Sequence, residues 1–191
     1  MAETVTNVTT GKPKTGGAAY YAPVGTTLPT DTAGTLDTKF KALGYISDDG
    51  LTNTNAPDTY TVSAWGGDTV LNLTKTKEDT FKFTAIETLN PDVLAAVYGT
   101  SNVTGTLSTG ITVKANSDST ESLAWVFDMI MRDGALKRIV VPNASITDIG
   151  DIEYKDDGAT GYEITISASP DDSGNTHYEY IKAATTASIG V

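Results

Sequence analysis

Histidine is the first residue type to test for catalysis, and the sequence contains one, His177. A Ser-His-Asp triad would have to use this one residue, and a metal site built from several histidines cannot form. Cysteine is absent, which excludes disulfides, thiolate metal ligands and thiol nucleophiles. His177 lies in a tyrosine-rich segment next to an aspartate-rich turn, a setting more typical of a surface or packing histidine than of a catalyst. We therefore predict no catalytic residue.

Acidic pairs are the next candidates for chemistry, because calcium needs several carboxylate oxygens brought together. The pairs are Asp48-Asp49, Asp156-Asp157 and Asp171-Asp172. Each one stands beside Gly or Ser-Gly, the residues of tight turns, and no Asp-x-Asp-x-Asp-Gly loop with a distant Glu occurs. Turns are the better interpretation. With no glycine-rich phosphate-binding motif either, we predict no metal site and no cofactor.

The composition favours strands over helices. Thr is the most frequent residue of the 191, Gly is plentiful, and charged residues make up 19%, which is typical of β structure and turns. No apolar run approaches the roughly 18 to 20 residues that a membrane span needs, and the first ten residues lack the pattern of a secretion signal. We expect a β-dominated protein that is made and kept in the cytoplasm until something releases it.

The net charge of -11 opposes tight binding of nucleic acid, because phosphate contacts need clustered Lys and Arg. An acidic surface repels DNA and keeps it from adhering, so the same charge is compatible with a conduit through which DNA passes. The simpler alternative is that the charge keeps the protein soluble.

One domain with arms is the expected organisation. Residues 1–19 are Thr, Gly, Ala and Lys with almost nothing large and apolar, which indicates a flexible N-terminal arm. Residues 20–181 form the β domain. Within it, the stretch 22–40 is punctuated by Pro and Gly and is longer than most loops, so we expect contact with a partner there. Residues 182–191 form a C-terminal tail.

Alternating apolar and polar residues predict the strands of the first half. We expect a short strand at 43–46 ending in a turn at 48–50, and a half-buried strand at 60–64 that is broken at 65–68. Two further strands, at 70–74 and 81–88, are expected to pair with each other as a hairpin.

A single segment carries full helix punctuation and predicts a short α-helix over Pro91 to Tyr98. Asn90 is suited to the N-cap, Pro91 to the first helical position, Asp92 to the positive end of the helix, and Gly99 to its termination. Its apolar residues recur at helical spacing, so the helix should lie against a sheet.

The apolar run 121–131 fits helix or strand by composition. We choose strand, because residues 132–135 carry a tight-turn signal and 136–141 is a β-branched run stopped by Pro142, which together make a hairpin. Two later strands are expected at 162–168 and 177–181.

Several sequence segments, in matching order and spacing, resemble the major tail proteins of long-tailed phages infecting actinobacteria. They are Leu43-Gly44-Tyr45-Ile46-Ser47-Asp48-Asp49-Gly50-Leu51, Ala64-Trp65-Gly66-Gly67-Asp68, Ile86-Glu87-Thr88-Leu89-Asn90-Pro91-Asp92-Val93-Leu94, Trp125-Val126-Phe127-Asp128, Lys137-Arg138-Ile139-Val140-Val141-Pro142, Tyr154-Lys155-Asp156-Asp157 and Gly161-Tyr162-Glu163-Ile164-Thr165. The likeness spans about 22–180, and its specificity lies in the ordered set rather than in any single segment.

The resemblance implies a mainly β sandwich or barrel of the tail tube type with one flanking helix. It further implies that six copies close into a ring and that rings stack around a channel that passes DNA without binding it specifically. Expected protein partners are further copies of the chain and other tail proteins: the tape measure, the tail terminator and the distal tail protein. Because residue 181 lies close to the end of the chain, no added immunoglobulin-like domain is expected.

Candidate residues for this role fall into two groups. The candidates for the assembly interface are Tyr20, Tyr21, Tyr45 and Trp65. The candidates for the channel wall are Glu153 and Glu163, both expected on strands that otherwise alternate cleanly. An exposed outer face or a pair between subunits is the open alternative for each.

Two other functions compete with the tail tube. A soluble surface- or carbohydrate-binding β-sandwich would suit a Thr-rich, Trp-containing chain, although a secretion signal and a cleft of exposed aromatic residues would be more natural for it. A glycoside hydrolase is third, because a pair of carboxylates alone can cleave glycosides.

Overall fold

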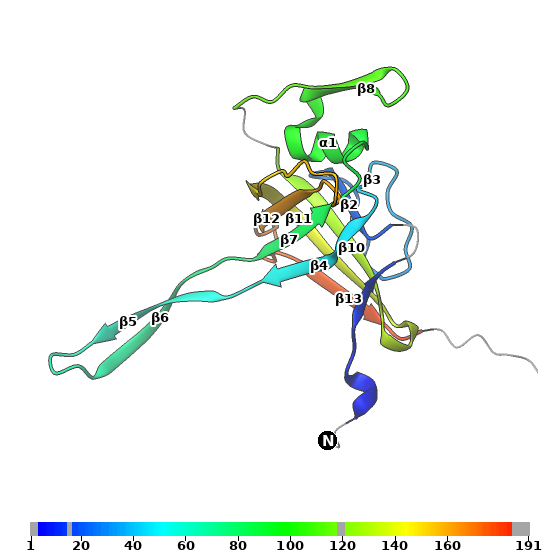
Figure 1. Ribbon diagram of the computed structural model, residues 1–191. Helices are drawn as coiled ribbons and strands as arrows, with labels where there is room; N and C mark the ends of the chain where they lie inside the picture. Colours follow the sequence, from blue (N-terminus) through cyan, green and yellow to red (C-terminus); the bar gives the residue numbers. More distant parts are fainter. Residues whose placement is uncertain (1–3, 15–16, 118–120, 185–191) are drawn as a thin grey trace, which may run out of the picture.

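Nine antiparallel strands form one large sheet that folds back on itself around the core (Figure 1). The computed structural model describes residues 4–14, 17–117 and 121–184. The strands of this sheet are β1 (Gly11–Pro13), β2 (Ala19–Pro23), β3 (Lys41–Ala42), β4 (Ile46–Thr54), β7 (Thr80–Ala85), β10 (Leu123–Met131), β11 (Leu136–Ile149), β12 (Tyr162–Ala168) and β13 (Tyr178–Lys182). Their order is β3-β2-β10-β11-β12-β7-β4, with β1 also paired to β10 and β13 to β11.

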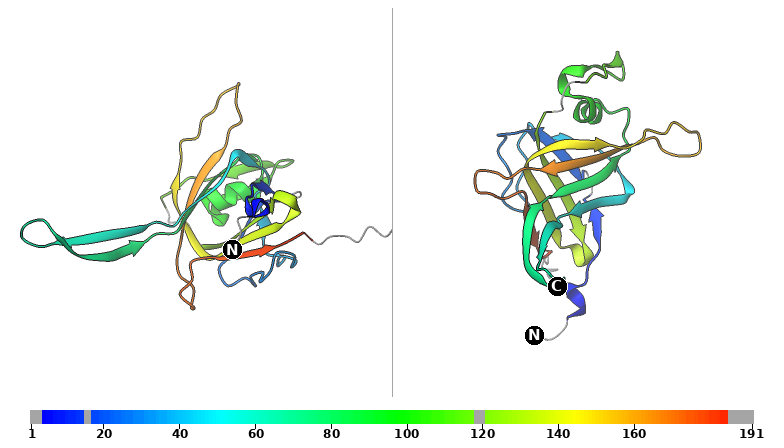
Figure 2. Two further views of the ribbon diagram at one scale, coloured as in Figure 1. Left: turned by 90° about the horizontal axis from the view of Figure 1, so that it is seen from below. Right: turned by 90° about the vertical axis from the view of Figure 1, so that its left-hand side faces the viewer.

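Aromatic side chains join the two halves of the folded sheet. The ring of Phe83 on β7 lies 5.9 Å from that of Trp125 and 5.4 Å from that of Phe127 on β10, and Phe81 stacks on Phe127 at 5.9 Å. These rings are at most 3% exposed. The right-hand view of Figure 2 shows the strands of the sheet curving around a common interior. The expected mainly β sandwich or barrel is therefore confirmed.

Strand β11 makes the bend possible. Its first half pairs with β10 and β13, and its second half pairs with β12. Leu123 and Trp125 of β10 face Ala144 and Val141, so β11 carries one extra residue between them, at the position of Pro142. Proline is tolerated at such a bulge because no ladder bond is lost. The prediction that Pro142 stops the strand is wrong, whereas the choice of strand for 121–131 and its hairpin is confirmed.

The one α-helix among the described residues, α1 (Pro91–Tyr98), has the predicted bounds. The side chain of Asn90 caps it by accepting from the Asp92 amide at 3.0 Å, and Gly99 ends it with a positive φ of 92°. The Tyr21 hydroxyl donates to the Asp92 carbonyl oxygen at 2.9 Å, which ties the helix to β2. The buried residues of the helix are Val93, Leu94, Ala96 and Val97.

Two hairpins project from the sheet: β5 (Pro57–Ser63) with β6 (Thr69–Lys77), and β8 (Val103–Thr106) with β9 (Gly110–Val113). The first continues β4 and β7 outward and extends far from the body (Figure 1). The predicted hairpin between 70–74 and 81–88 is wrong, because β6 pairs with β5 while β7 pairs with β4 and β12. The strand expected at 60–64 exists, but β5 is exposed rather than half-buried.

The expected turn at 48–50 lies inside β4. Between the pairs Ile46–Ala85 and Leu51–Phe83 the strand holds a bulge, and Gly50 within it has a φ of 74°. A left-handed conformation suits glycine, so the Asp-Asp-Gly signal was correct about the backbone conformation but marks a bulge instead of a chain reversal.

The segment expected as a flexible arm, 1–19, is partly bound to the sheet. Strand β1 pairs with residues 129–131 of β10, the Lys14 amide donates to the Asp128 carbonyl oxygen at 3.1 Å, and Ala19 begins β2 in the core. Thr9 also accepts from the Arg132 amide at 2.9 Å. These contacts replace the expected freedom in residues 9–14, while residues 1–3 and 15–16 lie outside the described residues.

The long loop and the C-terminal strand lie close to where the sequence predicted them. Strand β2 extends to Pro23, and residues 24–40 contain no strand or helix. The last strand, expected at 177–181, is β13, one residue later at each end. Lys182 therefore belongs to β13 rather than to the expected tail 182–191, and residues 185–191 lie outside the described part of the chain.

Candidate assembly surfaces

The projecting hairpin β5–β6 is a two-stranded ribbon with one apolar and one polar face. Tyr60 pairs with Leu73 and Val62 with Leu71, which places these four side chains on the same face. The opposite face carries the pairs Thr59–Thr74 and Thr61–Asn72. The alternation of apolar and polar residues along both strands thus produces an amphipathic ribbon.

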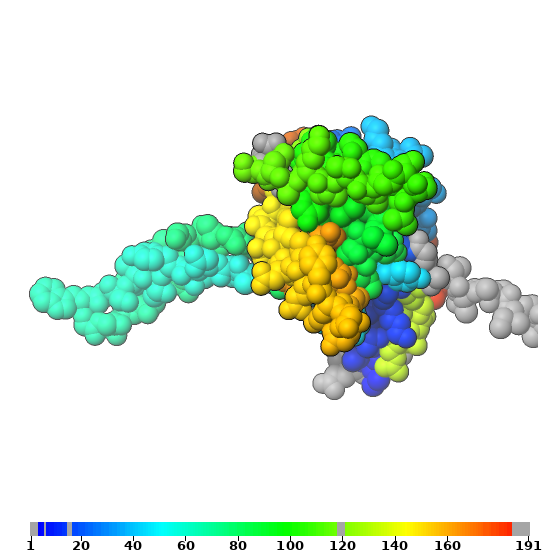
Figure 3. All heavy atoms as spheres, turned by 45° about the horizontal axis from the view of Figure 1, so that its top comes forward, coloured from blue at the N-terminus to red at the C-terminus, as the bar shows by residue number. Residues whose placement is uncertain are grey.

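The apolar face of this ribbon is open to solvent. Tyr60 is 59% exposed, and Leu71 and Leu73 are exposed by about half. Figure 3 shows the ribbon, in cyan to green-blue, standing clear of the body. Isolated two-stranded hairpins are marginally stable in water, and contiguous exposed apolar surface marks interaction sites. The ribbon therefore has the properties of a surface that packs against another chain.

Trp65 stands at the tip of the ribbon and is fully exposed. The tip is closed by hydrogen bonds from the Ala64 amide to the Asp68 carbonyl oxygen at 2.7 Å and from the Gly67 amide to the Ala64 carbonyl oxygen at 3.0 Å. Gly66 and Gly67 both have positive φ, so glycine is needed to turn the chain here. The sequence suggested a break at this point; the structure makes it the hairpin turn that presents Trp65.

A buried carboxylate fastens the root of the ribbon. Asp79, 2% exposed, accepts hydrogen bonds from Asn53 at 2.8 Å, from Thr176 at 2.5 Å and from His177 Nδ1 at 2.5 Å. Burial alone raises the pKa of Asp79, but the three hydrogen bonds outweigh it and hold the pKa below its ordinary value. His177, whose ring also packs edge-on against Phe81, is thus a packing histidine, as the sequence suggested.

A second buried charge lies beneath the long loop 24–40. Arg138 of β11 donates to both carboxylate oxygens of its cross-strand neighbour Asp128, at 2.6 and 2.8 Å, and to the carbonyl oxygens of Asp31 and Gly34 in the loop, at 3.1 and 2.8 Å. The carboxylate raises the pKa of Arg138. Lys14 adds a second cation to Asp128 at 3.3 Å. This cluster binds the loop and the N-terminal segment to the sheet.

Sequence reasoning missed this cluster, although a signal was present. The expected turn at 132–135 would place residue 128 opposite residue 139, whereas the three-residue turn Arg132–Gly134 of the structure places it opposite Arg138. Two opposite charges in two apolar runs would then meet across the strands. The long loop was expected to contact a partner; in the structure its backbone contacts the subunit's own Arg138.

The four tyrosine and tryptophan candidates do not lie together. Trp65 is at the tip of the ribbon, and Tyr45, 76% exposed, lies just before β4. Tyr20 is half-buried on β2. Tyr21 is 5% exposed, packs against Trp125 at 5.8 Å and bonds to α1, so its burial contradicts the expectation of an interface residue.

The two glutamate candidates are both ion-paired. Glu163 on β12 pairs with Lys82 on β7 at 2.9 Å, with both side chains about half exposed. Glu153 accepts from Lys155 at 2.7 Å in the exposed segment 150–161, which contains no strand, so the expectation that it lies on a strand is wrong. The pairing with Lys155 lowers the pKa of Glu153. Both residues are accessible, and their place relative to a channel stays a prediction.

The acidic pairs form turns and bulges in the described residues. Asp171 accepts from the amides of Ser173 and Asn175, at 2.9 and 3.0 Å, which is the hydrogen-bonding of a turn. Across 4–14, 17–117 and 121–184, no three His, Asp or Glu side chains gather as a metal site would need. No helix of this part is long and apolar enough to cross a membrane.

Comparison with known proteins agrees with a structural role. A family model described as phage tail tube protein matches residues 11–190. A search of the curated proteins finds no match. The match covers all nine strands of the sheet, the helix and both hairpins, and the chain therefore belongs to the phage tail tube protein family, whose members are structural subunits of the virion tail tube.

Proposed function

We propose that six copies of this chain close into a ring, and that the rings stack into the tube of a long, non-contractile phage tail. The family supports self-assembly into a tail tube. The resemblance to tail proteins of phages that infect actinobacteria supports the tail type. The tube would then be the conduit through which DNA leaves the particle.

The observation that carries this proposal is the amphipathic ribbon β5–β6. No described residue buries the apolar face of this ribbon, which is formed by Tyr60, Val62, Leu71 and Leu73. A hairpin of this kind needs a further surface for stability. A neighbouring copy of the chain supplies that surface in a tube, where every subunit has identical neighbours.

The same logic extends to other partners. A tube must end, so the copies at its two ends present ring surfaces to other proteins, for which the tail terminator and the distal tail protein are our candidates. The tape measure protein is the candidate for the channel during assembly. The net charge of -11 would let DNA pass without specific binding.

Replacing Leu71 and Leu73 by Thr tests the role of the ribbon. Because these side chains are exposed, the free energy of unfolding of the subunit should change by less than about 0.5 kcal/mol. Assembly should be lost, as measured by light scattering and negative-stain electron microscopy. The matched control replaces Thr61 and Thr74, on the polar face of the same ribbon, by Ala, and should leave assembly intact.

Two results would contradict the proposal at different levels. Strictly monomeric wild-type protein at high concentration, even with tail initiator proteins present, would remove the tube-forming role of the isolated chain. Equal assembly of the Leu71 and Leu73 variant and the control would keep the tube but remove the ribbon from its interfaces.

A further inference from the structure

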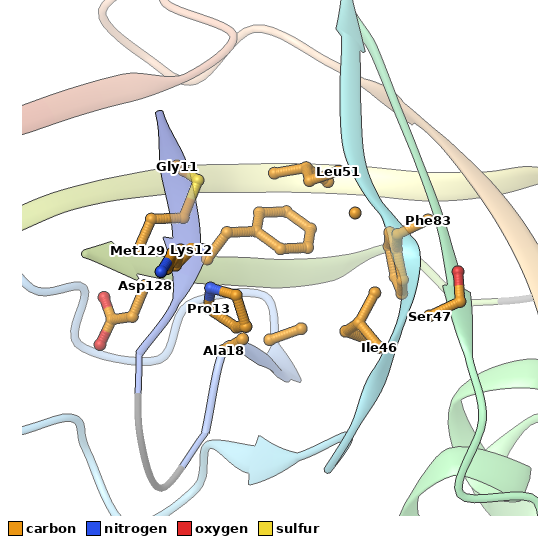
Figure 4. Close-up of a pocket in the computed structure, with 13 residues that line it drawn as sticks. Gly11, Lys12, Pro13, Ala18, Ile46, Ser47, Leu51, Phe83, Asp128 and Met129 are labelled. Carbon is orange, nitrogen blue, oxygen red and sulfur yellow. The ribbon is translucent and has the colours of Figure 1, made fainter. Parts of the chain in front are cut away.

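A groove opens between the N-terminal strand β1 and the bulged strand β4, on the body of the subunit. Phe83, Phe127 and Met129 line it, together with Pro13 of β1 and Leu51 of β4. Figure 4 shows Met129, Pro13, Leu51 and Phe83 around the pocket. Strand β4 is an edge of the sheet and β1 pairs only with β10, so no strand bridges the two. The cavity therefore ends on Phe83 and Phe127 of the aromatic core.

The groove has room for part of a large side chain. The apolar cavity measures about 90 Å³, and it adjoins a second hollow of about 450 Å³ that shares Pro13, Ala18 and Ile46 with it. A cavity of roughly 150 Å³ encloses a benzene ring, so the apolar end would take one edge of an aromatic ring. The rest of that ring would lie over Pro13 and Ile46 at the mouth.

We infer that this groove receives Trp65 from the ribbon of a second copy of the chain, an inference that rests on the proposed self-assembly. Trp65 is a large aromatic side chain with no cover in the subunit. The ribbon continues β4 and β7 and points away from the body (Figure 1), so the subunit's own Trp65 does not fold back onto its own groove. From residue 54 to residue 65 the ribbon reaches about 35 Å at ~3.3 Å per residue, which is enough to cross to a neighbour.

Charge at the two surfaces is complementary. Asp68, three residues after Trp65, is the only charged residue in the segment 60–73. Lys12 lines the groove and has no ion pair with any residue that the structure describes. The other charged residue of the lining, Asp128, is already bound by Arg138 and Lys14. The apolar cavity therefore offers one cation without an ion pair to the one anion of the ribbon tip. In the adjoining hollow, Lys14 is paired with Asp128, and Glu87 accepts a hydrogen bond from the Tyr45 amide at 3.0 Å.

The combination has the form of an interface hot spot: an aromatic anchor entering an apolar pocket, with a charge pair at its rim. Such anchors dominate binding energy, and rim charges set orientation and partner choice. Trp65 would supply the affinity and the Asp68–Lys12 pair would fix which way the ribbon lies.

Replacement of Trp65 tests the anchor. Trp65→Ala should raise the protein concentration needed for assembly by about 30-fold, the equivalent of ~2 kcal/mol for a hot-spot residue, while Trp65→Phe should retain part of the effect. Thr61→Ala, on the polar face of the same ribbon, is the control and should assemble at the wild-type concentration. Acrylamide quenching of Trp65 fluorescence should be strong in the subunit, where Trp65 is exposed, and weak in the assembled tube. The other tryptophan, Trp125, is buried in the subunit and does not contribute to the change.

Charge reversal tests the orientation. Lys12→Glu and Asp68→Lys should each weaken assembly, and the double variant should restore it. Because the chain has no cysteine, the pair can also be trapped: a Lys12→Cys, Asp68→Cys protein should form disulfide-linked ladders when tubes are oxidised. A Ser173→Cys, Asp68→Cys protein, with its first cysteine on a different exposed turn, should not.

The inference is overturned if wild-type protein forms tubes while Trp65→Ala forms them at the same concentration, or if the cross-link fails in assembled Lys12→Cys, Asp68→Cys tubes. In either case the tube itself stands. If the wild-type chain does not assemble at all, the proposed function fails first, and the two failures are thereby distinguished.

Discussion

Two buried aspartates, Asp128 and Asp79, hold separate parts of the chain to the sheet. Asp128 with Arg138 binds the loop 24–40 and Lys14 of the N-terminal segment. Asp79 binds β4 through Asn53 and the approach to β13 through Thr176 and His177. A buried charge is stable only when it is paired and hydrogen-bonded, so removing one partner at either site should cost far more than removing an exposed charge.

Arg138→Met should lower the free energy of unfolding by about 3–5 kcal/mol, because it leaves Asp128 buried with only the more distant Lys14 as a cation. Urea unfolding followed by circular dichroism measures the loss. Lys155→Met removes a cation from an exposed pair with Glu153 and should leave stability unchanged. A loss for Arg138→Met no larger than that of the control would show that the loop does not depend on this cluster.

Asp79→Asn should lower the free energy of unfolding at pH 7 by about 1.5–3 kcal/mol, since it replaces hydrogen bonds to a charged acceptor. The pKa of Asp79 is lowered in the folded protein. Its ionised form therefore contributes stability above the unfolded pKa of about 3.9, and that contribution is lost as the pH falls through the folded pKa.

The difference in stability between wild type and variant should accordingly begin to shrink below about pH 4 and disappear only below the folded pKa, which is lower; unfolding curves at pH 7, 5 and 3 would show the decrease. Asp156→Asn, in an exposed loop, is the control and should follow wild type throughout. A difference between wild type and Asp79→Asn that persists unchanged at pH 3 would mean that the ionised carboxylate is not what holds the root of the ribbon.

At the scale of elements, the sequence predicted the features that depend on neighbouring residues but not the pairing of strands that are distant in the sequence. The bounds of α1 follow from Asn90, Pro91 and Gly99, residues that act within one turn of the chain. The β10–β11 hairpin follows from its short turn. The pairing of β4 with β7 was missed, because about 25 residues of ribbon separate the two strands and no local signal records which strands meet.

The ribbon β5–β6 shows a different limit of sequence reasoning. Alternation in 60–64 predicted a half-buried strand, and the alternation is real, yet the subunit leaves the apolar face exposed. An alternating pattern indicates that one face of a strand becomes buried, but it does not indicate whether the same chain or another chain buries it. Burial by a neighbouring copy would reconcile the pattern with the structure. The tip residue Trp65 was predicted as an interface candidate, while Lys12 and the groove, which depend on the packing of β1 beside β4, were not.

The N-terminal strand provides a test at this scale. Deletion of residues 1–15 should leave a folded subunit, because the core contains no residue before Ala19. It should still lower stability by about 1–3 kcal/mol through loss of the β1–β10 bonds and of the ion pair from Lys14. Circular dichroism and urea unfolding measure both effects. Deletion of residues 1–8 keeps β1 and should leave both the fold and the stability unchanged. A deletion of residues 1–15 that fails to fold would place β1 among the elements essential to the domain.

The whole molecule is a folded sheet with projections in several directions. The ribbon β5–β6, the hairpin β8–β9 beside α1, and the segment 150–161 leave the body on different sides (Figures 1 and 2). A subunit of a stacked tube needs contacts around its ring and along the tube axis, and separate projections can serve separate directions. The large buried core keeps the shape of the body fixed while these parts engage neighbours.

The charge of the assembled channel is the remaining property at this scale. With a net charge of -11 per subunit, a ring concentrates charge around a narrow bore, where low-dielectric walls focus the field. We predict a bore of net negative potential. In the subunit, Lys82 and Lys155 offset part of the charge of Glu163 and Glu153, so the remaining acidic residues must supply most of the potential.

Replacing both Glu153 and Glu163 by Lys would leave Lys82 and Lys155 unpaired and make the potential at both places strongly positive. If these positions face the channel, particles should assemble but eject DNA more slowly, because cations on the wall attract phosphate. The delay should be largest near 0.01 M salt, where the Debye length is about 30 Å, and small at 0.15 M, where it is about 8 Å. Glu179→Lys, at a partly exposed pair with Lys137, is the control, and it is compared with Glu163→Lys alone so that the change of charge is equal. An equal delay in the control would show that net charge, and not the position of the charges on the channel wall, causes the effect. A neutral or positive bore in an assembled tube would refute the electrostatic argument while leaving the tube assignment in place.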